Sequence, residues 1–431
     1  MNKNLKNKLY VIIFTSLLFY SCGENNVIAS FDHSTKAESF KDISYKIPVS
    51  DAVFTVLDVI NSTKGSTRNA SSAEIENIEV VKTTPAITRS LKANSLSSDT
   101  LLYIINFKDG GFGVAAADSR TAPIYAYSDK GHFNLKDTCQ VLALKMFIKS
   151  AIHTILYDIN NQGNNPRFAE TPETRNELLE QVGPFMDIEW SQNNPYNKEC
   201  VIGTEYAKAG CVAIATAQIC AYNKYPNTFE GYNYDWNTIY KIKSSSDQYK
   251  YPDATNQLAH FIRRVGLNVG MKYGVKESGA KSEKIPGLLR KMGYTCSDLI
   301  SYSDKGLVES LKAGHPVYQC GFDKESDYFI FQTHSDGHAW VVDGYRYEML
   351  NIRICRPRRG EMDCDSEKRR FLFVRNNYGW GGLYNGWYQP FVTMPDTNGK
   401  RIPTFAFKPR MITNIHLSLI HISEPTRLRR I

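Results

Sequence analysis

The sequence lacks the patterns that mark metal and nucleic-acid binding. No two of its nine cysteines are separated by two residues, the spacing of common zinc sites, so we expect no metal. The formal charge of +8 is spread along the chain, and the one dense basic cluster, at 356–359 and 368–370, has no nucleic-acid-binding motif beside it. No tandem repeat is present. We therefore expect no cofactor and no nucleic-acid partner.

The sequence has one long apolar run, at the N-terminus, and no second one. It covers residues 9–20 and follows three lysines, which predicts a secretory signal peptide over residues 1–21 and not a membrane-spanning helix. Cys22 follows the predicted cut directly, as in bacterial lipoproteins, where this cysteine carries the acyl chains that bind the membrane. Phe19 and Tyr20 are bulky for that motif, so ordinary secretion is the alternative. Either way we expect export to the cell envelope or the medium.

The other end of the chain is unusual for a different reason. The stretch Leu417–Arg427 resembles a translated sequencing adapter of the kind found at the ends of assembled gene fragments. We therefore expect a non-native tail over residues 416–431 and exclude it from the fold. The alternative is a genuine basic tail.

What is present is enough apolar sequence for more than one core, since 42% of the 431 residues are hydrophobic. Residues 61–100 are rich in Ser, Thr and Asn and indicate a connector with one strand at Ile78–Val81. A hairpin follows, with strands Leu101–Phe107 and Phe112–Ala116 around an Asp-Gly-Gly turn. Helical spacing of apolar residues then predicts a helix over 141–155. Together these elements predict a small α+β unit.

A polar, asparagine-rich stretch after residue 160 ends this unit. The chain from 183 to 415 is continuous and rich in aromatic residues, with helices first and strands late, such as Ala339–Val342 and Phe371–Val374. This order predicts a second, larger domain of helices packed against an antiparallel sheet.

Cys211 is the first candidate for chemistry in this domain. It follows Ala209-Gly210 and precedes Val-Ala-Ile-Ala-Thr-Ala-Gln, so it stands at the start of a predicted helix. The unpaired N–H groups and the helix dipole at such a position favour the thiolate over the thiol. Cys211 is therefore a candidate nucleophile. The alternative is a buried free cysteine in a core helix.

A cysteine nucleophile needs a base, a group that orients the base and an oxyanion site. His338 in Gly337-His338-Ala339 enters a strand and is the candidate base, with strand capping as its alternative role. The side-chain oxygen of Asn377, in Asn377-Tyr378-Gly379-Trp380-Gly381-Gly382, would accept the imidazole N–H, and Trp380 would shield that bond from water. Gln192, upstream in Trp190-Ser191-Gln192-Asn193-Asn194-Pro195, would stabilise the oxyanion together with the Cys211 N–H.

The order Gln, Cys, His, Asn and the residues around each of them resemble the streptopain family of papain-like cysteine peptidases, in particular its Bacteroides-type lipoprotein members. The segment Val265–Gly274 resembles the family's approach to the substrate cleft. Tyr378 departs from the pattern, because the family usually has tryptophan there. The resemblance runs from about 101 to 415.

The resemblance implies a papain-like α+β fold preceded by an inhibitory prodomain, and so a zymogen of a cysteine endopeptidase acting on proteins or peptides. It implies pro-segment and connector over 22–100, the rest of the prodomain over 101–175 and a catalytic domain over 183–415. Activation cuts are expected between about 160 and 180, with Arg167 and Arg175 as candidates. The substrate contacts that it implies are Ser278, Gly279, Gly337 and Trp380.

Two other functions stay open at this stage. Papain-like lipoproteins that hydrolyse peptidoglycan peptides use the same Cys and His chemistry, although they lack such a prodomain. A non-catalytic surface inhibitor or binding lipoprotein would use only the prodomain-like half. Cysteine pairing is also open: with Cys22 lipidated and Cys211 catalytic, seven cysteines remain, so at least one is free or pairs between chains. Cys355 and Cys364 flank a polar loop that a disulfide could close in an exported protein.

Overall fold

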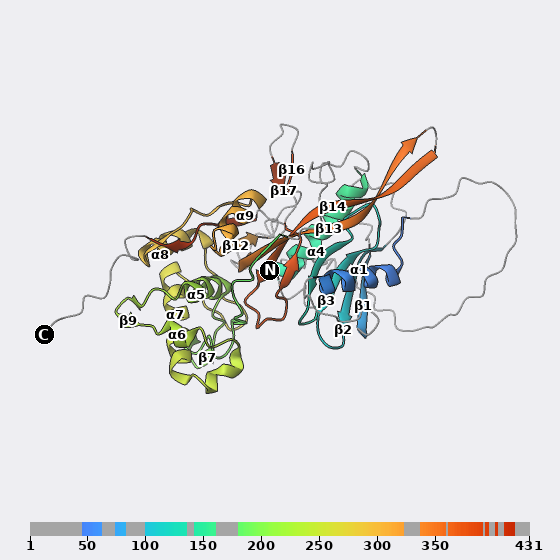
Figure 1. Cartoon of the computed structure of the whole chain (residues 1–431). Helices are drawn as coiled ribbons and strands as arrows, with labels where there is room; N and C mark the ends of the chain where they lie inside the picture. The colour runs from blue at the N-terminus through green and yellow to red at the C-terminus, as the bar shows by residue number, and fades with distance from the viewer. Residues whose placement is uncertain are drawn as a thin grey trace, which may run out of the picture. The chain divides into compact units, whose positions relative to one another are not determined.

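The computed structural model describes residues 45–62, 74–82, 100–135, 142–160, 180–322, 337–358, 361–390, 393–395, 401–403 and 409–418 (Figure 1). The predicted signal peptide, Cys22 and the predicted activation stretch lie outside these residues. The chain from Ser44 onward forms one compact unit. In the described ranges, no helix is both long enough and apolar enough to cross a membrane.

The N-terminal part is an antiparallel sheet packed against two helices. Its elements are α1 (Val49–Ser62), β1 (Ile75–Lys82), β2 (Thr100–Phe107), β3 (Phe112–Ala116), β4 (Ile124–Ser128) and α4 (Leu142–Asn160). The predicted hairpin is confirmed as β2 and β3, and the predicted strand and helix as β1 and α4. Gly110 and Gly111 make the hairpin turn with φ angles of 82° and 102°, a region that favours glycine. β2 is buried along its whole length, as a strand covered on both faces must be.

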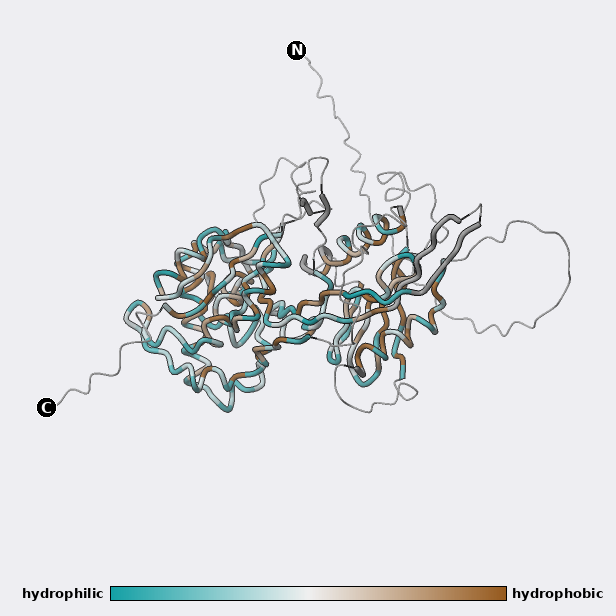
Figure 2. Tube along the Cα trace, turned by 45° about the horizontal axis from the view of Figure 1, so that its top comes forward, coloured by the Kyte–Doolittle hydropathy of each residue, from teal (hydrophilic) through white to brown (hydrophobic). Residues whose placement is uncertain are grey.

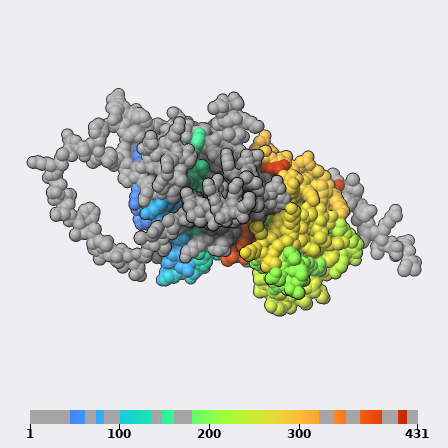
Figure 3. Space-filling view, turned by 180° about the vertical axis from the view of Figure 1, so that it is seen from behind, coloured from blue at the N-terminus to red at the C-terminus, as the bar shows by residue number. Residues whose placement is uncertain are grey.

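The middle of the chain is mainly helical. Its helices are α5 (Cys211–Asn223), α6 (Trp236–Ile239), η2 (Ser245–Tyr249), α7 (Pro252–Val269), η3 (Ser282–Lys284), α8 (Ile285–Lys291) and α9 (Asp304–Lys312). Two short hairpins accompany them: β6 (Val201–Ile202) with β7 (Glu205–Tyr206), and β8 (Thr228–Phe229) with β9 (Tyr232–Asn233). In α5 all ten residues from Val212 to Ala221 are buried, because its small apolar side chains let neighbours pack on every side. Seen from behind, the helical part forms the green to orange surface of Figure 3.

The late strands form the antiparallel sheet that the sequence predicts. They are β12 (Val317–Phe322), β13 (Gly337–Arg358), β14 (Glu361–Asn377), β15 (Gly386–Tyr388) and β18 (Arg410–Ile412), with β5 (Gln181–Val182), β11 (Ile300–Ser301), β16 (Thr393–Pro395) and β17 (Arg401–Pro403) as short additions. All pairings are antiparallel, and helices pack on the sheet, so the predicted α+β class is confirmed.

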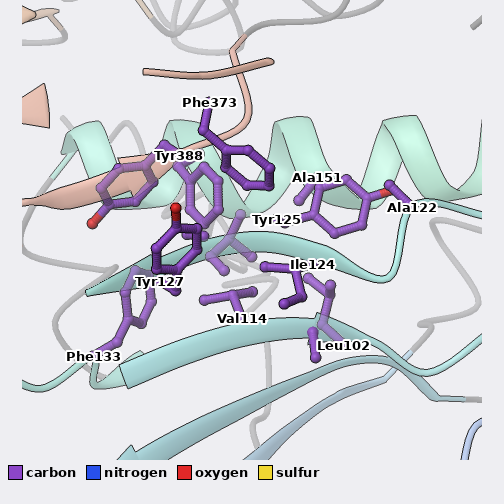
Figure 4. Close-up of a cluster of buried hydrophobic side chains, with 14 of the residues drawn as sticks. Leu102, Val114, Ala122, Ile124, Tyr125, Tyr127, Phe133, Ala151, Phe373 and Tyr388 are labelled. Atoms are coloured by element: carbon purple, nitrogen blue, oxygen red, sulfur yellow. The ribbon is translucent and has the colours of Figure 1, made fainter. Parts of the chain in front are cut away.

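The sheet does not stop at the predicted boundary between the two parts. Its order is β1-β2-β3-β4-β15-β14-β13-β12-β18-β11, so β4 of the N-terminal part pairs directly with β15. Beneath this joint the apolar side chains mix (Figure 4). The ring of Tyr127 lies 5.4 Å from that of Phe373, and the ring of Phe147 lies 4.9 Å from that of Tyr388.

The described residues therefore have two hydrophobic cores that do not follow the predicted boundary. One core joins the N-terminal part to the late strands, and the other joins α5, α7 and α8 to the opposite end of the sheet. Figure 2 shows the apolar residues of both cores in brown inside the fold. The N-terminal part thus shares a core with the sheet and with α9, and not with α5, α7 and α8.

Two features bear on the cysteines and the chain end. β13 and β14 form a long hairpin in which Cys355 and Cys364 are direct register partners; their side chains lie outside the described residues, and the disulfide stays a prediction. Near the C-terminus, β19 (His416–Leu417) pairs with β10 (Tyr294–Thr295). The fold thus includes residues at the start of the stretch that we expected to be tail, while 419–431 lie outside the described residues.

Candidate active site

Cys211 is the first residue of α5, as the sequence predicts. Gly210 before it has a φ of 89°, a region that favours glycine. The backbone N–H groups of Ala339, Val212 and Cys211 itself favour the thiolate and so oppose a rise in the pKa of the Cys211 thiol. The helix start and strand β13 therefore meet at this sulfur.

The ionisation state of Cys211 differs from the expected one. We expected the helix start to favour the thiolate, but burial is the larger effect and raises the pKa of the Cys211 thiol. The thiol is therefore the favoured form at neutral pH in this conformation.

His338 lies at the start of β13, the strand against which α5 packs, and opposite Gly321 of β12. Burial lowers the pKa of its imidazole to about 4, so the ring is neutral at neutral pH. Its Nε2 lies 3.1 Å from the carbonyl oxygen of Tyr378 and must carry the proton, since a carbonyl can only accept. Nδ1 is then the ring nitrogen able to take a proton. The rings of Trp340 and Trp380 lie 6.0 and 6.4 Å from the imidazole.

Asn377 ends β14, paired with Val341, but its side chain has partners other than the expected one. Its Oδ1 accepts from Gln218 Nε2 at 3.0 Å and from Gly379 N at 3.2 Å, and its Nδ2 donates to Ile188 O at 2.8 Å. The imidazole N–H is bound by the carbonyl of Tyr378 instead of by the Asn377 side chain. In this conformation Asn377 joins three segments around the site, and its role toward His338 stays a prediction.

The segment that carries Gln192 is fixed on both sides of the site. The backbone oxygen of Gln192 accepts from Ala209 N at 2.9 Å, two residues before Cys211. The carbonyl of Trp190 accepts from Gly381 N at 3.0 Å. A half-buried Gln192 is thereby held between the Cys211 loop and the loop that carries Trp380.

Ser278 and Gly279, the expected substrate contacts, are hydrogen-bonded to backbone atoms within the fold. Ser278 Oγ donates to the carbonyl of Lys208 at 2.6 Å and accepts from Gly274 N at 3.0 Å. Gly279 pairs with Lys272 through two backbone bonds. Ser278 therefore ties the 272–279 loop to the loop that leads into Cys211, which the sequence could not reveal because the partners are backbone atoms.

Two groups of this site were missed at the sequence level. Gln218 is fully buried and bonds Asn377; its position seven residues after Cys211 puts both on one face of α5, which is the signal that could have found it. The other is the Tyr378 carbonyl, which no side-chain motif can indicate. Among the described residues, no group of three or more His, Cys, Asp or Glu could hold a metal ion.

Comparison with known proteins gives two family matches. Residues 190–388 match the Peptidase C10 family, and residues 48–155 match the Spi protease inhibitor family. The first match contains all four predicted catalytic positions. The second covers the N-terminal part from just before α1 into α4.

Individual proteins are similar over much of the chain. Streptopain of Streptococcus pyogenes serotype M28 is 25% identical over 348 residues, which cover 70% of this chain and 77% of streptopain. The thiol protease/hemagglutinin PrtT of Porphyromonas gingivalis is 23% identical over 333 residues, which cover 67% of this chain and 33% of PrtT. The structure of a Prevotella intermedia prointerpain A fragment superposes with a TM-score of 0.49 at 20% identity, covering 79% of this chain and all of the fragment.

Proposed function

The chain belongs to the Peptidase C10 family, the streptopain family of papain-like cysteine peptidases, and from that premise we propose that it is an exported zymogen of an endopeptidase with Cys211 as nucleophile. Its N-terminal part resembles a protease inhibitor and acts as the intramolecular inhibitor. The observation that carries the proposal is the packing of α5, which begins at Cys211, against β13, which begins at Gly337-His338.

The proposed reaction uses four groups. The Cys211 sulfur attacks the carbonyl carbon of the scissile peptide bond, and its proton passes to His338 Nδ1. The Cys211 N–H and the Gln192 side chain stabilise the negative oxygen that forms. The protonated imidazole then gives its proton to the leaving amine, which leaves an acyl-enzyme. Water, deprotonated by His338, attacks the thioester and restores the Cys211 thiol.

Desolvation of the half-buried Cys211 and the buried His338 supports latency in the intact chain. It raises the pKa of the Cys211 thiol and lowers that of the His338 imidazole to about 4, so both groups are uncharged at neutral pH. A thiolate–imidazolium pair is disfavoured in this state, because a charged group loses hydration when it is buried. Solvent entry after removal of the N-terminal part would shift both pKa values toward the ionised pair.

The activation cut and the destination are further parts of the proposal. We place the cut between 160 and 180, with the mature chain retaining Glu180, whose carboxylate bonds Lys312 Nζ at 2.8 Å and the Tyr345 hydroxyl at 2.8 Å. β5 follows Glu180 directly and pairs with β13, so the sheet fixes the chain from this point. The predicted signal peptide supports export, and Cys22 is the predicted lipid anchor.

The direct test replaces Cys211 with alanine in the full chain. Secreted Cys211→Ala protein should stay unprocessed and should not degrade casein, while Cys296→Ala, which removes another half-buried free thiol, should be processed and active. Self-processing or casein hydrolysis by Cys211→Ala would refute the assignment. Release of fragments from purified cell wall, with none from casein, would favour peptidoglycan hydrolysis instead.

A further inference from the structure

A small polar cluster lies under the joint between β4 and β15. Tyr127 of β4, in the N-terminal part, is the register partner of Trp387 of β15, in the catalytic part. Arg346 and Glu348, two residues apart on β13, lie beneath this pair. The Arg346 guanidinium carbon is 4.7 Å from the centre of the Tyr127 ring and 4.8 Å from that of the Trp387 ring.

The charges in this cluster are removed from solvent. The side chains of Arg346 and Glu348 are each 3% exposed and form an ion pair through Arg346 Nε and Glu348 Oε1. The Tyr127 hydroxyl donates to the same carboxylate oxygen. The N-terminal part thus covers a charge pair that belongs wholly to the catalytic part.

The pair is incompletely satisfied. Arg346 Nη2 and Glu348 Oε2 are buried, and neither has a hydrogen-bond partner in the part of the chain that the structure describes. Burial raises the pKa of the Glu348 carboxyl even though the guanidinium opposes that rise, so desolvation outweighs attraction here. Burying an ion pair stabilises a contact only when its remaining polar atoms are bonded, which is not the case at these two atoms.

We propose that Arg346 and Glu348, covered by Tyr127, form a release contact that weakens the hold of the N-terminal part on the catalytic part. Separation of β4 from β15 returns both charges to water, so their hydration favours opening. In the N-terminal part, Tyr127 contacts this charge pair, through its hydroxyl to Glu348 and its ring to Arg346. The contact therefore depends on the N-terminal part being in place. A role for this contact in activation rests on the proposed zymogen function; the energetics of the joint do not.

This inference predicts opposite effects for breaking and for replacing the charge pair. Glu348→Ala leaves a buried guanidinium without a counter-charge and should open the joint more often. The double variant Arg346→Met/Glu348→Leu removes both charges while keeping apolar volume, and it should open less often. A cluster that merely stabilised the joint would be weakened by both changes.

Hydrogen exchange of the full chain measures this opening. In the Cys211→Ala background, which needs no catalysis, we expect amides of β4 and β15 to exchange about tenfold faster in Glu348→Ala and about threefold slower in the double variant. Glu348→Gln should lie between Glu348→Ala and the parent. Amides of α5 should exchange at unchanged rates. Exchange in the double variant that equals or exceeds that of the parent would overturn the inference.

Two further results keep the test decisive. Tyr127→Phe, a milder change, should raise exchange in β4 and β15 about threefold, as expected for one lost hydrogen bond; an unchanged rate would remove Tyr127 from the contact. With Cys211 present, the half-time for processing of the zymogen to the mature enzyme should be shortest in Glu348→Ala, intermediate in the parent and longest in the double variant. If exchange follows this order and processing does not, the release contact stands and the activation role fails.

Discussion

Gln218 Nε2 donates a 3.0 Å hydrogen bond to Asn377 Oδ1 and so fixes the end of β14 to the helix that begins at Cys211. Both side chains are fully buried. The two halves of the candidate site, the helix that begins at Cys211 and the sheet with His338, are therefore joined by a polar contact as well as by packing.

The first prediction concerns this bond. Gln218→Leu leaves Asn377 Oδ1 with the Gly379 N–H alone, and a buried acceptor that loses a partner destabilises the fold by about 1–3 kcal/mol. We expect kcat/KM of the processed enzyme to fall about tenfold, because the end of β14 shifts relative to Cys211. Gln248→Leu, at a half-buried position on η2, is the control and should have wild-type kinetics. Wild-type kinetics for Gln218→Leu would show that the bond does not position the site.

The second prediction separates two roles for Ser278. As the tie between the 272–279 loop and Lys208, its loss should displace Gly210 and Cys211, so Ser278→Ala should lower kcat with little change in KM. The lost hydrogen bonds should reduce stability by about 1 kcal/mol. A substrate contact would instead raise KM with kcat unchanged, as steady-state kinetics on a peptide substrate will show.

The third prediction follows from the imidazole of His338. Its pKa is lowered to about 4 in the fold, against an ordinary value of about 6.5, so the unfolded chain takes up a proton first as the pH falls. The free energy of unfolding therefore has its full value above pH 6.5, where the imidazole is neutral in both states. It falls as the pH decreases toward 4, because the unfolded chain is protonated and the folded one is not. The loss is about 3 kcal/mol.

Urea unfolding of the Cys211→Ala chain measures that loss. Between pH 7 and pH 4.5 the parent should lose more stability than His338→Gln, whose side chain does not titrate in this range. An equal loss in both chains would mean that the imidazole is not buried in its neutral form.

The fourth prediction concerns Cys355 and Cys364. Directly opposed residues of an antiparallel pair have Cα atoms about 4.5–5.5 Å apart, within the range that a disulfide spans. Alkylation of the unfolded, unreduced exported protein should therefore spare these two cysteines and label Cys296. Alkylation of Cys355 and Cys364 without prior reduction would exclude the disulfide.

The sequence predicted local structure well where one segment determines it. The glycine turn at 110–111 and the alternation around it gave the β2–β3 hairpin, and Gly210-Cys211 gave the start of α5. The joint between β4 and β15 could not be predicted in the same way, because strand pairing across more than 250 residues leaves no local pattern. The shared core of Tyr127, Phe373 and Tyr388 depends on that joint.

The contacts of the predicted site residues in this conformation could not be predicted from the sequence. Motifs identify side chains, so they named Cys211, His338 and Asn377. They could not show that the Tyr378 carbonyl binds the imidazole, nor that burial makes the Cys211 thiol harder to ionise. Both effects arise from packing between segments that are far apart in the sequence.

The central claim is that Cys211 is a nucleophile held unreactive in the intact chain. Labelling with an epoxide peptide inhibitor, followed by intact-mass and peptide analysis before and after processing, tests it most directly. The account predicts no label on the intact chain and one label, on Cys211, after processing. Equal labelling of the intact chain, or labelling of another cysteine after processing, would contradict it.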